Sequence, residues 1–240
     1  MLKPIHQPAD GPLKAVAVCS GPGNSVWSSL DLQRDMETKG DCPFEIVGLF
    51  SDRPASRALE EADRRRLRKY LLDAGTYHQG EPGSLMSTQD NQTFEESVVD
   101  LLNPAGAGCL LVDGYQWTIG PKLLEKYQVI RVWPGGPTCL KNFLKTGQTV
   151  LRAKVTFLTA PGGVGPVMLT APPLDIDYGR FKDEKSAVAL YLPPVMGQSG
   201  QAGARALLEI SLGHFSLNEA GGLYFKGQAS PEGLMLERWE

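Results

Sequence analysis

Histidine and cysteine are both scarce in this chain. The 240 residues include three histidines, His6, His78 and His214. They also include four cysteines, Cys19, Cys42, Cys109 and Cys139. The cysteines are widely spaced, with no C-x-x-C pair and no histidine close in sequence, so neither a zinc site nor a disulfide scaffold is predicted. We expect reduced, mostly buried thiols, no bound metal, and no mechanism that needs several histidines.

Long runs of one kind of residue are also missing. There are 24 basic and 27 acidic side chains, for a formal net charge of −3, and no long basic run, which argues against nucleic acid as a partner. No apolar stretch approaches the roughly 18 residues of a membrane span, and residues 1–12 lack the apolar core of a secretory signal. We therefore expect a cytoplasmic protein without a membrane partner.

Apolar runs alternate with helical patterns through the first half of the chain. Buried strands are predicted at Lys14–Cys19, Phe44–Phe50, Gly108–Asp113 and Val129–Trp133. Helices are predicted from Val26 with Asn24 or Ser25 as N-cap, at Ala55–Leu72, from Thr93 with a Thr93/Glu96 capping box, and at Pro121–Tyr127. A polar loop is predicted between, at Asp73–Asn91. This order indicates an α/β fold with a mostly parallel sheet covered by helices on both faces, and ligand sites after Cys19, Asp113 and Trp133.

The second half has a different character. We predict an α/β domain over residues 1–180 and a C-terminal extension over 181–240 that packs on the same domain. Strands are predicted at Val155–Leu158 and Val164–Leu169, around a glycine-rich bend. The extension is predicted to hold a flexible join at Gly197–Gly203, a helix at Ala204–Leu212, and a hairpin of Leu223–Lys226 with Leu234–Trp239.

A glycine loop follows the first strand. Backbone N–H groups at a helix N-terminus favour a phosphate or another anion, so a small anionic ligand is predicted here. The candidate phosphate-binding residues are Ser20, Gly21, Gly23, Asn24 and Ser25. The loop is not a Walker A motif, because no Gly-Lys-Ser/Thr follows, and Val26 replaces the third glycine of G-x-G-x-x-G. The alternative is that the glycines only make a tight turn.

Other candidate groups also have two interpretations. Arg53 could bind an anion, or Asp52 could cap the next helix with Arg53 as a surface charge. The basic run Arg64–Lys69 is offset by acidic residues on the same helix, which is typical of a solvated face. Tyr115 and Trp117 could stack on a flat ligand or belong to the core.

Several motifs resemble those of the formyltransferase family, over about residues 15–177. Ser20–Ser25 is similar to the family's phosphate-binding S-G-N-G-S-N, and Ser51–Ser56 to its S-N-R-P-x-A. Val112–Ile119 resembles the strand and loop that form the folate pocket, and Thr156–Thr170 resembles the later H-F-V-x-x-x-x-D-x-G-P-V-I-L-Q. The resemblance implies a Rossmann-like formyltransferase fold and 10-formyltetrahydrofolate as a cofactor.

The family's polar catalytic positions are altered. In L-N-I-H-P the Asn stabilises an oxyanion and the His assists proton transfer, but this chain has Arg131 and Trp133 there. Gly163 aligns with the family's aspartate and Thr156 with a second histidine. The resemblance therefore places Arg131 as the one catalytic candidate. The resemblance also implies a ligand pocket lined by Tyr115, Gln116, Trp117, Thr118, Trp133, Thr156 and Gly163.

Three functions follow from this pattern. The first is a formyltransferase-like binding protein that keeps the phosphate loop and has lost transfer chemistry. The second is an active one-carbon transferase in which Arg131 stabilises the oxyanion. The third is a non-catalytic partner-binding protein. A guanidinium can donate to an oxyanion, but it cannot act as a base near neutral pH, and an indole N–H accepts nothing.

Overall fold

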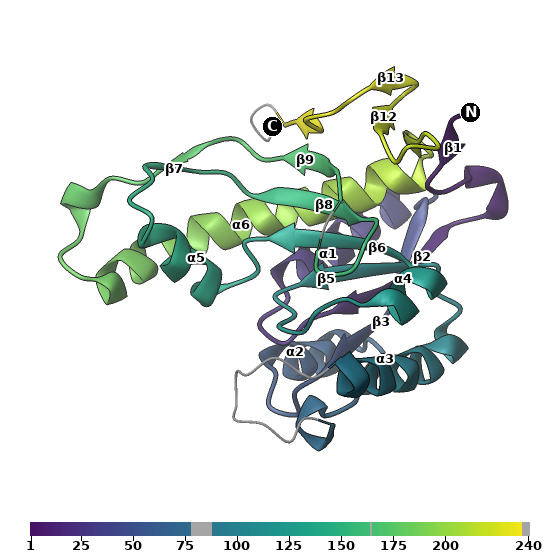
Figure 1. Cartoon of the computed structure of the whole chain (residues 1–240), viewed down its shortest axis with the longest axis horizontal. Helices are drawn as coiled ribbons and strands as arrows, with labels where there is room; N and C mark the ends of the chain where they lie inside the picture. Colours follow the sequence, from purple (N-terminus) through teal and green to yellow (C-terminus); the bar gives the residue numbers. More distant parts are fainter. Residues whose placement is uncertain (78–87, 164, 237–240) are drawn as a thin grey trace.

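The computed structural model describes residues 1–77, 88–163 and 165–236. At its centre, an eight-stranded sheet has the order β14-β9-β8-β6-β5-β2-β3-β4 (Figure 1). Its strands are β2 (Leu13–Val18), β3 (Phe44–Ser51), β4 (Lys69–Leu71), β5 (Cys109–Asp113), β6 (Gln128–Trp133), β8 (Lys154–Leu158), β9 (Val167–Thr170) and β14 (Leu234–Met235). The strands from β6 to β4 run parallel, whereas β8 is antiparallel to β6 and to β9. The predicted mostly parallel sheet is confirmed.

Helices cover both faces of this sheet (Figure 1). One face packs on α1 (Asn24–Lys39), α2 (Arg57–Arg65) and α6 (Glu184–Ser211), and the other on α3 (Thr88–Leu102) and α4 (Pro121–Lys126). Strand β5 shows why both faces must be covered. All of its residues are buried, and its successive apolar side chains belong alternately to the core on one face and the core on the other. Within the described residues, no helix is long and apolar enough to cross a membrane.

The predicted helix Ala55–Leu72 is wrong in its second half. Helix α2 ends at Arg65, because Arg66 adopts the left-handed conformation with φ 59° and its N–H turns back to the carbonyls of Ala62 and Asp63. The chain then continues into the edge strand β4, which buries Tyr70 against the sheet.

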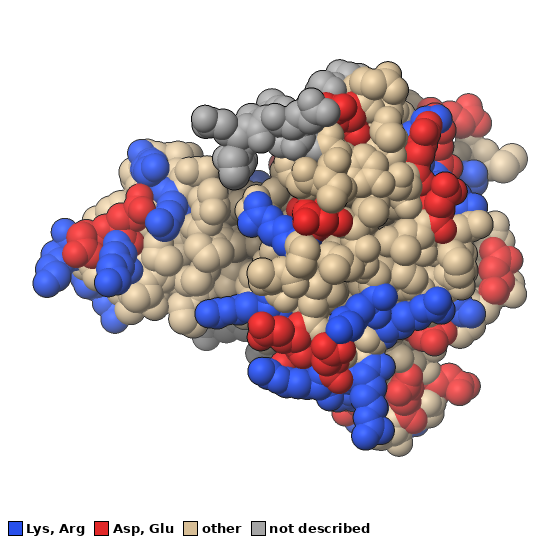
Figure 2. Space-filling model, turned by 90° about the horizontal axis from the view of Figure 1, so that it is seen from below, with Lys and Arg blue, Asp and Glu red and all other residues tan. Residues whose placement is uncertain are grey.

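The basic run lies on and after α2. Arg64 and Arg65 both pair with Glu61, at 3.1 and 2.9 Å, and Lys69 pairs with Asp63 at 2.6 Å. Figure 2 shows this side of the molecule, with Lys and Arg interspersed with Asp and Glu. A solvated face of mixed charge was predicted here and is confirmed.

Helix α3 begins five residues earlier than predicted. It starts at Thr88, and Thr93 lies inside it with its Oγ1 donating to the carbonyl of Gln89, so the predicted capping box is wrong. Part of the predicted Asp73–Asn91 loop is a 3₁₀ turn, Ala74–Thr76. His78 lies outside the described residues.

Helix α6 runs without a break through the residues predicted as a flexible join. Gly200 and Gly203 lie against α1, where a Cβ added at Gly203 would come 2.7 Å from the Cβ of Ser25. These glycines allow the close approach of α1 and α6, which explains them better than flexibility does. Pro193 and Pro194 are also inside the helix.

The predicted C-terminal hairpin is wrong too. Strand β12 (Leu223–Phe225) pairs with β11 (Phe215–Leu217) and β13 (Gln228–Ala229), and β11 also pairs with β1 (Lys3–Pro4). Strand β14 instead lies parallel to β9 in the main sheet. The division at residues 180/181 stays a prediction.

A projecting lobe extends from the end of the sheet at which β6 ends (Figure 1). It contains α5 (Pro137–Leu144), the strand pair β7 (Val150–Leu151) and β10 (Leu174–Asp175), and the first part of α6, around its own apolar core. Helix α5 was not predicted, although Pro137 at its first position is a common start signal.

Candidate functional site

The segments that follow β2, β5 and β6 meet around one hollow of about 580 Å³. We call it the glycine-loop hollow. Its described lining is Gly21, Pro22, Gly114, Tyr115, Gln116, Gly135, Gly136, Pro137, Thr138 and Cys139. The carboxyl ends of parallel strands form the ligand sites of open α/β sheets, so this is the candidate site.

Two glycine backbones lie in close contact at the base of the glycine-loop hollow. A Cβ added at Gly114 would lie 2.3 Å from the carbonyl oxygen of Gly135, and one added at Gly135 would lie 2.4 Å from the amide nitrogen of Gly114. The backbones after β5 and β6 therefore touch, which only glycine permits at these positions. Gly114 also has a φ of 69°.

The glycine loop enters α1 in a different way from the prediction. The N-cap is Gly23, with φ 67°, and neither Asn24 nor Ser25 caps the helix. Ser25 donates to Asp113 Oδ2 twice, from its backbone N at 2.8 Å and from its Oγ at 2.9 Å. Ser20 accepts at its Oγ from the backbone N of Gln116, at 3.3 Å. The candidate phosphate residues thus lie together, but Ser25 is already bound by an internal carboxylate.

Two helices point their N-termini toward this hollow. Neither α1, capped by Gly23, nor α5, capped by Gly136, has a side-chain hydrogen bond at its N-cap. Helix α5 therefore presents backbone N–H groups and the positive end of its dipole, whereas the Ser25 N–H at the start of α1 is already bound to Asp113. Arg53 adds a cation at the rim, where its Nη2 donates to Gln116 Oε1 and its Nε lies 4.0 Å from Asp52 Oδ2. Arg53 and the N-terminus of α5 are thus the groups at this hollow that favour an anion.

Two buried carboxylates lie beneath it. Asp113 and Asp52 are each about 1% exposed, and each has one Oδ1 without a partner among the described residues. Burial raises the pKa of Asp113, and the hydrogen bonds from Ser25 oppose that rise. Burial, together with these two carboxylates, also raises the pKa of the Cys19 thiol. Asp52 does not cap α2 as one interpretation predicted; Ser56 does.

The predicted pocket residues fall on different surfaces. Tyr115 packs edge-on against Phe50, with ring centroids 6.4 Å apart, and burial raises its pKa well above the ordinary value. Trp117 donates from Nε1 to Asp52 Oδ2 at 2.7 Å, and Thr118 is exposed. Gln116 lies on the rim.

Arg131 fills the place where the resemblance expects an aspartate. Its Nη2 donates to the carbonyl of Trp117 at 3.4 Å, and burial lowers its pKa. A Cβ added at Gly163 would lie 2.8 Å from Arg131 Nη1. Thr156 lies directly opposite Arg131 on β8, so both side chains are on one face.

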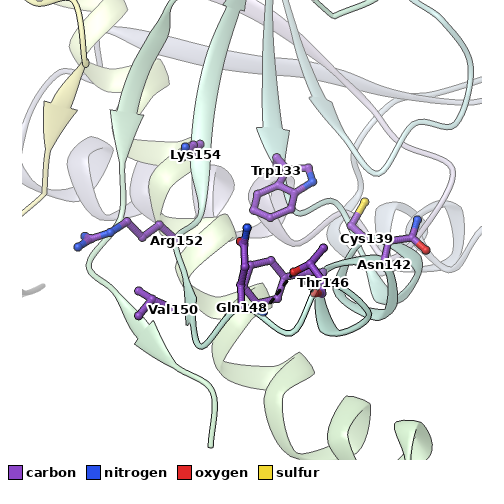
Figure 3. Close-up of a pocket in the computed structure, with 9 residues that line it drawn as sticks. Trp133, Cys139, Asn142, Thr146, Gln148, Val150, Arg152 and Lys154 are labelled. Atoms are coloured by element: carbon purple, nitrogen blue, oxygen red, sulfur yellow. Dashed lines mark hydrogen bonds between the residues drawn. The ribbon is translucent and has the colours of Figure 1, made fainter. Parts of the chain in front are cut away.

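Trp133 lines a second hollow, of about 480 Å³, between β6, α5 and β8 (Figure 3). We call it the Trp133 hollow. Its described lining is Trp133, Cys139, Asn142, Phe143, Thr146, Gln148, Val150, Arg152 and Lys154. Sequence reasoning singled out Trp133 but missed Arg152 and Lys154, because their proximity depends on the β6–β8 pairing.

The two described histidines are remote from both hollows. His6 lies next to Ile5, whose carbonyl accepts from Gln128 at the start of β6, the end opposite Trp133. His214 binds Glu209 at the far end of α6. No group of three or more potential metal ligands occurs among the residues that the structure describes.

Comparisons with known proteins bear on the fold. No protein-family model and no curated protein matches the chain. Among solved structures, the phosphoribosylglycinamide formyltransferase of Coxiella burnetii has a TM-score of 0.70 at 16% identity, covering 94% of this chain and 100% of its own. The glycinamide ribonucleotide transformylase 1 of Symbiobacterium toebii has a TM-score of 0.70 at 17% identity, covering 89% and 94%.

A third solved structure has a different activity by name. The formyltetrahydrofolate deformylase of Pseudomonas putida has a TM-score of 0.63 at 15% identity, covering 93% of this chain and 71% of its own. At these identities the likeness concerns the fold, because one fold can carry many functions. The chain has the Rossmann-like fold of the formyltransferases, which confirms the resemblance read from its motifs.

Proposed function

We propose that this chain is a binding protein of formyltransferase fold, which holds a small phosphate-bearing ligand in the glycine-loop hollow and does not transfer a formyl group. The observation that carries the proposal is the lining itself. Among its described residues there is no histidine and no carboxylate, whereas the N-terminus of α5 and Arg53 favour an anion.

Formyl transfer to an amine needs two kinds of group. When the amine attacks the formyl carbon, a hydrogen-bond donor must stabilise the negative charge that forms on the formyl oxygen, and a base must take the proton from the amine. Arg131 can donate but cannot accept. Tyr115 keeps its proton because its pKa is raised. Both carboxylates are buried: Asp52 Oδ2 accepts a hydrogen bond from Trp117, and Asp113 Oδ2 accepts from Ser25. The described site therefore supplies a donor without a base.

The residues present do not fit the use of 10-formyltetrahydrofolate as a formyl donor. Arg131 occupies the space beside Gly163 in which an aspartate would stand, and Trp133 is directed into the other hollow. The chain could still bind 10-formyltetrahydrofolate without transferring its formyl group. This folate is a candidate ligand because a protein of the same fold is named a formyltetrahydrofolate deformylase.

Isothermal titration calorimetry with inorganic phosphate and with phosphoribosylglycinamide tests the proposal. We expect both to bind, and Arg53→Gln to weaken both about fivefold by removing the rim cation. The matched control is Arg64→Gln, an exposed arginine on α2 that pairs with Glu61. The proposal fails when neither ligand binds at about millimolar concentration, or when the two variants have equal effects.

A further inference from the structure

The Trp133 hollow combines an aromatic wall with two cations. Trp133 is 37% exposed and meets Phe143 edge-on, with ring centroids 6.4 Å apart. Lys154 lies directly opposite Trp133 in the antiparallel β6–β8 pairing, so the two side chains share one face of the sheet. Arg152 precedes Lys154 by two residues, and its guanidinium extends away from Trp133, toward Met235 (Figure 3).

The two positive charges are not neutralised by the described part of the chain. None of the residues described around this hollow is acidic. Lys154 has no carboxylate partner among them, and Arg152 Nη1 contacts only the Sδ of Met235, at 3.6 Å. The hollow is therefore a local concentration of positive charge beside an indole.

The remaining lining is neutral and polar. Gln148 and Thr146 bring amide and hydroxyl groups to the side of the hollow below the Trp133 ring in Figure 3, and Asn142 lies farther out, beyond Cys139. A volume of about 480 Å³ is in the size range of small-molecule sites. A cation with no acidic partner among the described residues favours an anion, the exposed indole favours a flat ring, and amide groups can bond to polar ring atoms.

We propose that the Trp133 hollow is a second binding site, distinct from the glycine-loop hollow, for an aromatic ring that carries a phosphate or carboxylate group. The ring stacks on Trp133, and Lys154, directly opposite it, binds the anionic group. Cys139 lies on the wall between the two hollows and lines both of them. The proposal does not depend on what the glycine-loop hollow binds.

Calorimetric titrations with four probes test this site. AMP joins a ring to a phosphate and phthalate joins a ring to carboxylates, whereas adenosine and inorganic phosphate each supply one part. We expect AMP or phthalate to bind more tightly than either single-part probe, and the better of the two identifies the anionic group. No binding of AMP or phthalate at about millimolar concentration overturns the proposal, as does binding of adenosine that is as tight as that of AMP.

Substitutions locate the binding. Trp133→Ala removes the stacking surface and should weaken binding about tenfold. Lys154→Gln keeps the stem but removes the charge, for a loss of about fivefold. Lys141→Gln is the matched control, because Lys141 is exposed on α5 and pairs with Glu184. Arg53→Gln, at the rim of the glycine-loop hollow, should leave phthalate binding unchanged, because phthalate carries no phosphate. A loss of phthalate binding in Lys141→Gln or Arg53→Gln that equals the loss in Lys154→Gln contradicts the assignment.

Discussion

Ser25 and Asp113 join the start of α1 to the end of β5 through two hydrogen bonds on one carboxylate oxygen, at 2.8 and 2.9 Å. The carboxylate thus sits at a helix N-terminus, the kind of position that binds phosphate in other proteins. Ser25 was a phosphate candidate by sequence. Its N–H and Oγ stabilise Asp113 in the structure, so an incoming anion is left to the neighbouring amides and to α5.

Asp113→Asn should change how stability depends on pH. The pKa of Asp113 is raised in the folded protein, so the unfolded chain releases this proton at lower pH than the folded chain does. Asp113 therefore lowers the free energy of unfolding as pH rises from about 4 through its folded pKa. Asparagine still accepts from Ser25 but does not ionise. Between about pH 4 and pH 7, the free energy of unfolding of the variant should rise relative to wild type.

Chemical denaturation at those two pH values checks this prediction. Asp113→Ala is the control, because it removes the acceptor for Ser25 and should be destabilised at both pH values by about 1–3 kcal/mol. A wild-type protein that gains stability relative to Asp113→Asn as pH rises contradicts the raised pKa.

Trp117→Phe tests the hydrogen bond to buried Asp52. The ring is kept, but Asp52 Oδ2 loses the Nε1 donor at 2.7 Å while Oδ1 already has no partner in the described chain. We expect a loss of about 1–3 kcal/mol in the free energy of unfolding. Trp27→Phe is a matched control, since Trp27 Nε1 donates to the carbonyl of Pro22. A backbone carbonyl on a partly exposed loop is easier to hydrate, so a larger loss in Trp27→Phe contradicts this account.

Gly135→Ala should disrupt the floor of the glycine-loop hollow. Its Cβ would lie 2.4 Å from the amide nitrogen of Gly114, so one backbone must move. We expect a loss of more than about 3 kcal/mol in thermal or chemical unfolding. Gly197→Ala, inside α6 with no atom within 4 Å of its added Cβ, should instead stabilise the protein by about 0.5–1 kcal/mol. Equal effects of the two substitutions would show that the close approach is not tight.

Features with a local cause could be predicted from the sequence. Strand β5 was recognisable because a strand buried on both faces is a continuous apolar run. The three loops that form the candidate site could be placed because they follow such strands. The formyltransferase fold could be recognised because its motifs keep their order and spacing even at 14–18% identity to solved structures.

Features that depend on tertiary contacts could not be predicted from the sequence. Helix α2 ends at Arg65 because its C-cap, Arg66, is left-handed, and this conformation carries no sequence signal. Helix α6 passes through glycines that look like a linker until α1 is placed beside them. Ser25 and Asp113 are 88 residues apart, and Trp133 meets Lys154 only through strand register.

The most direct test of binding without transfer is a single NMR experiment. The protein is mixed in excess with phosphoribosylglycinamide and 10-formyltetrahydrofolate carrying a ¹³C-labelled formyl group. We predict that the ³¹P resonance of the ribonucleotide shifts on binding, while the ¹³C formyl signal leaves the folate no faster than without protein. Faster transfer of the formyl group to the ribonucleotide, abolished by Arg131→Ala, would contradict the account and establish Arg131 as the oxyanion donor; an unshifted ³¹P resonance would contradict the binding site itself.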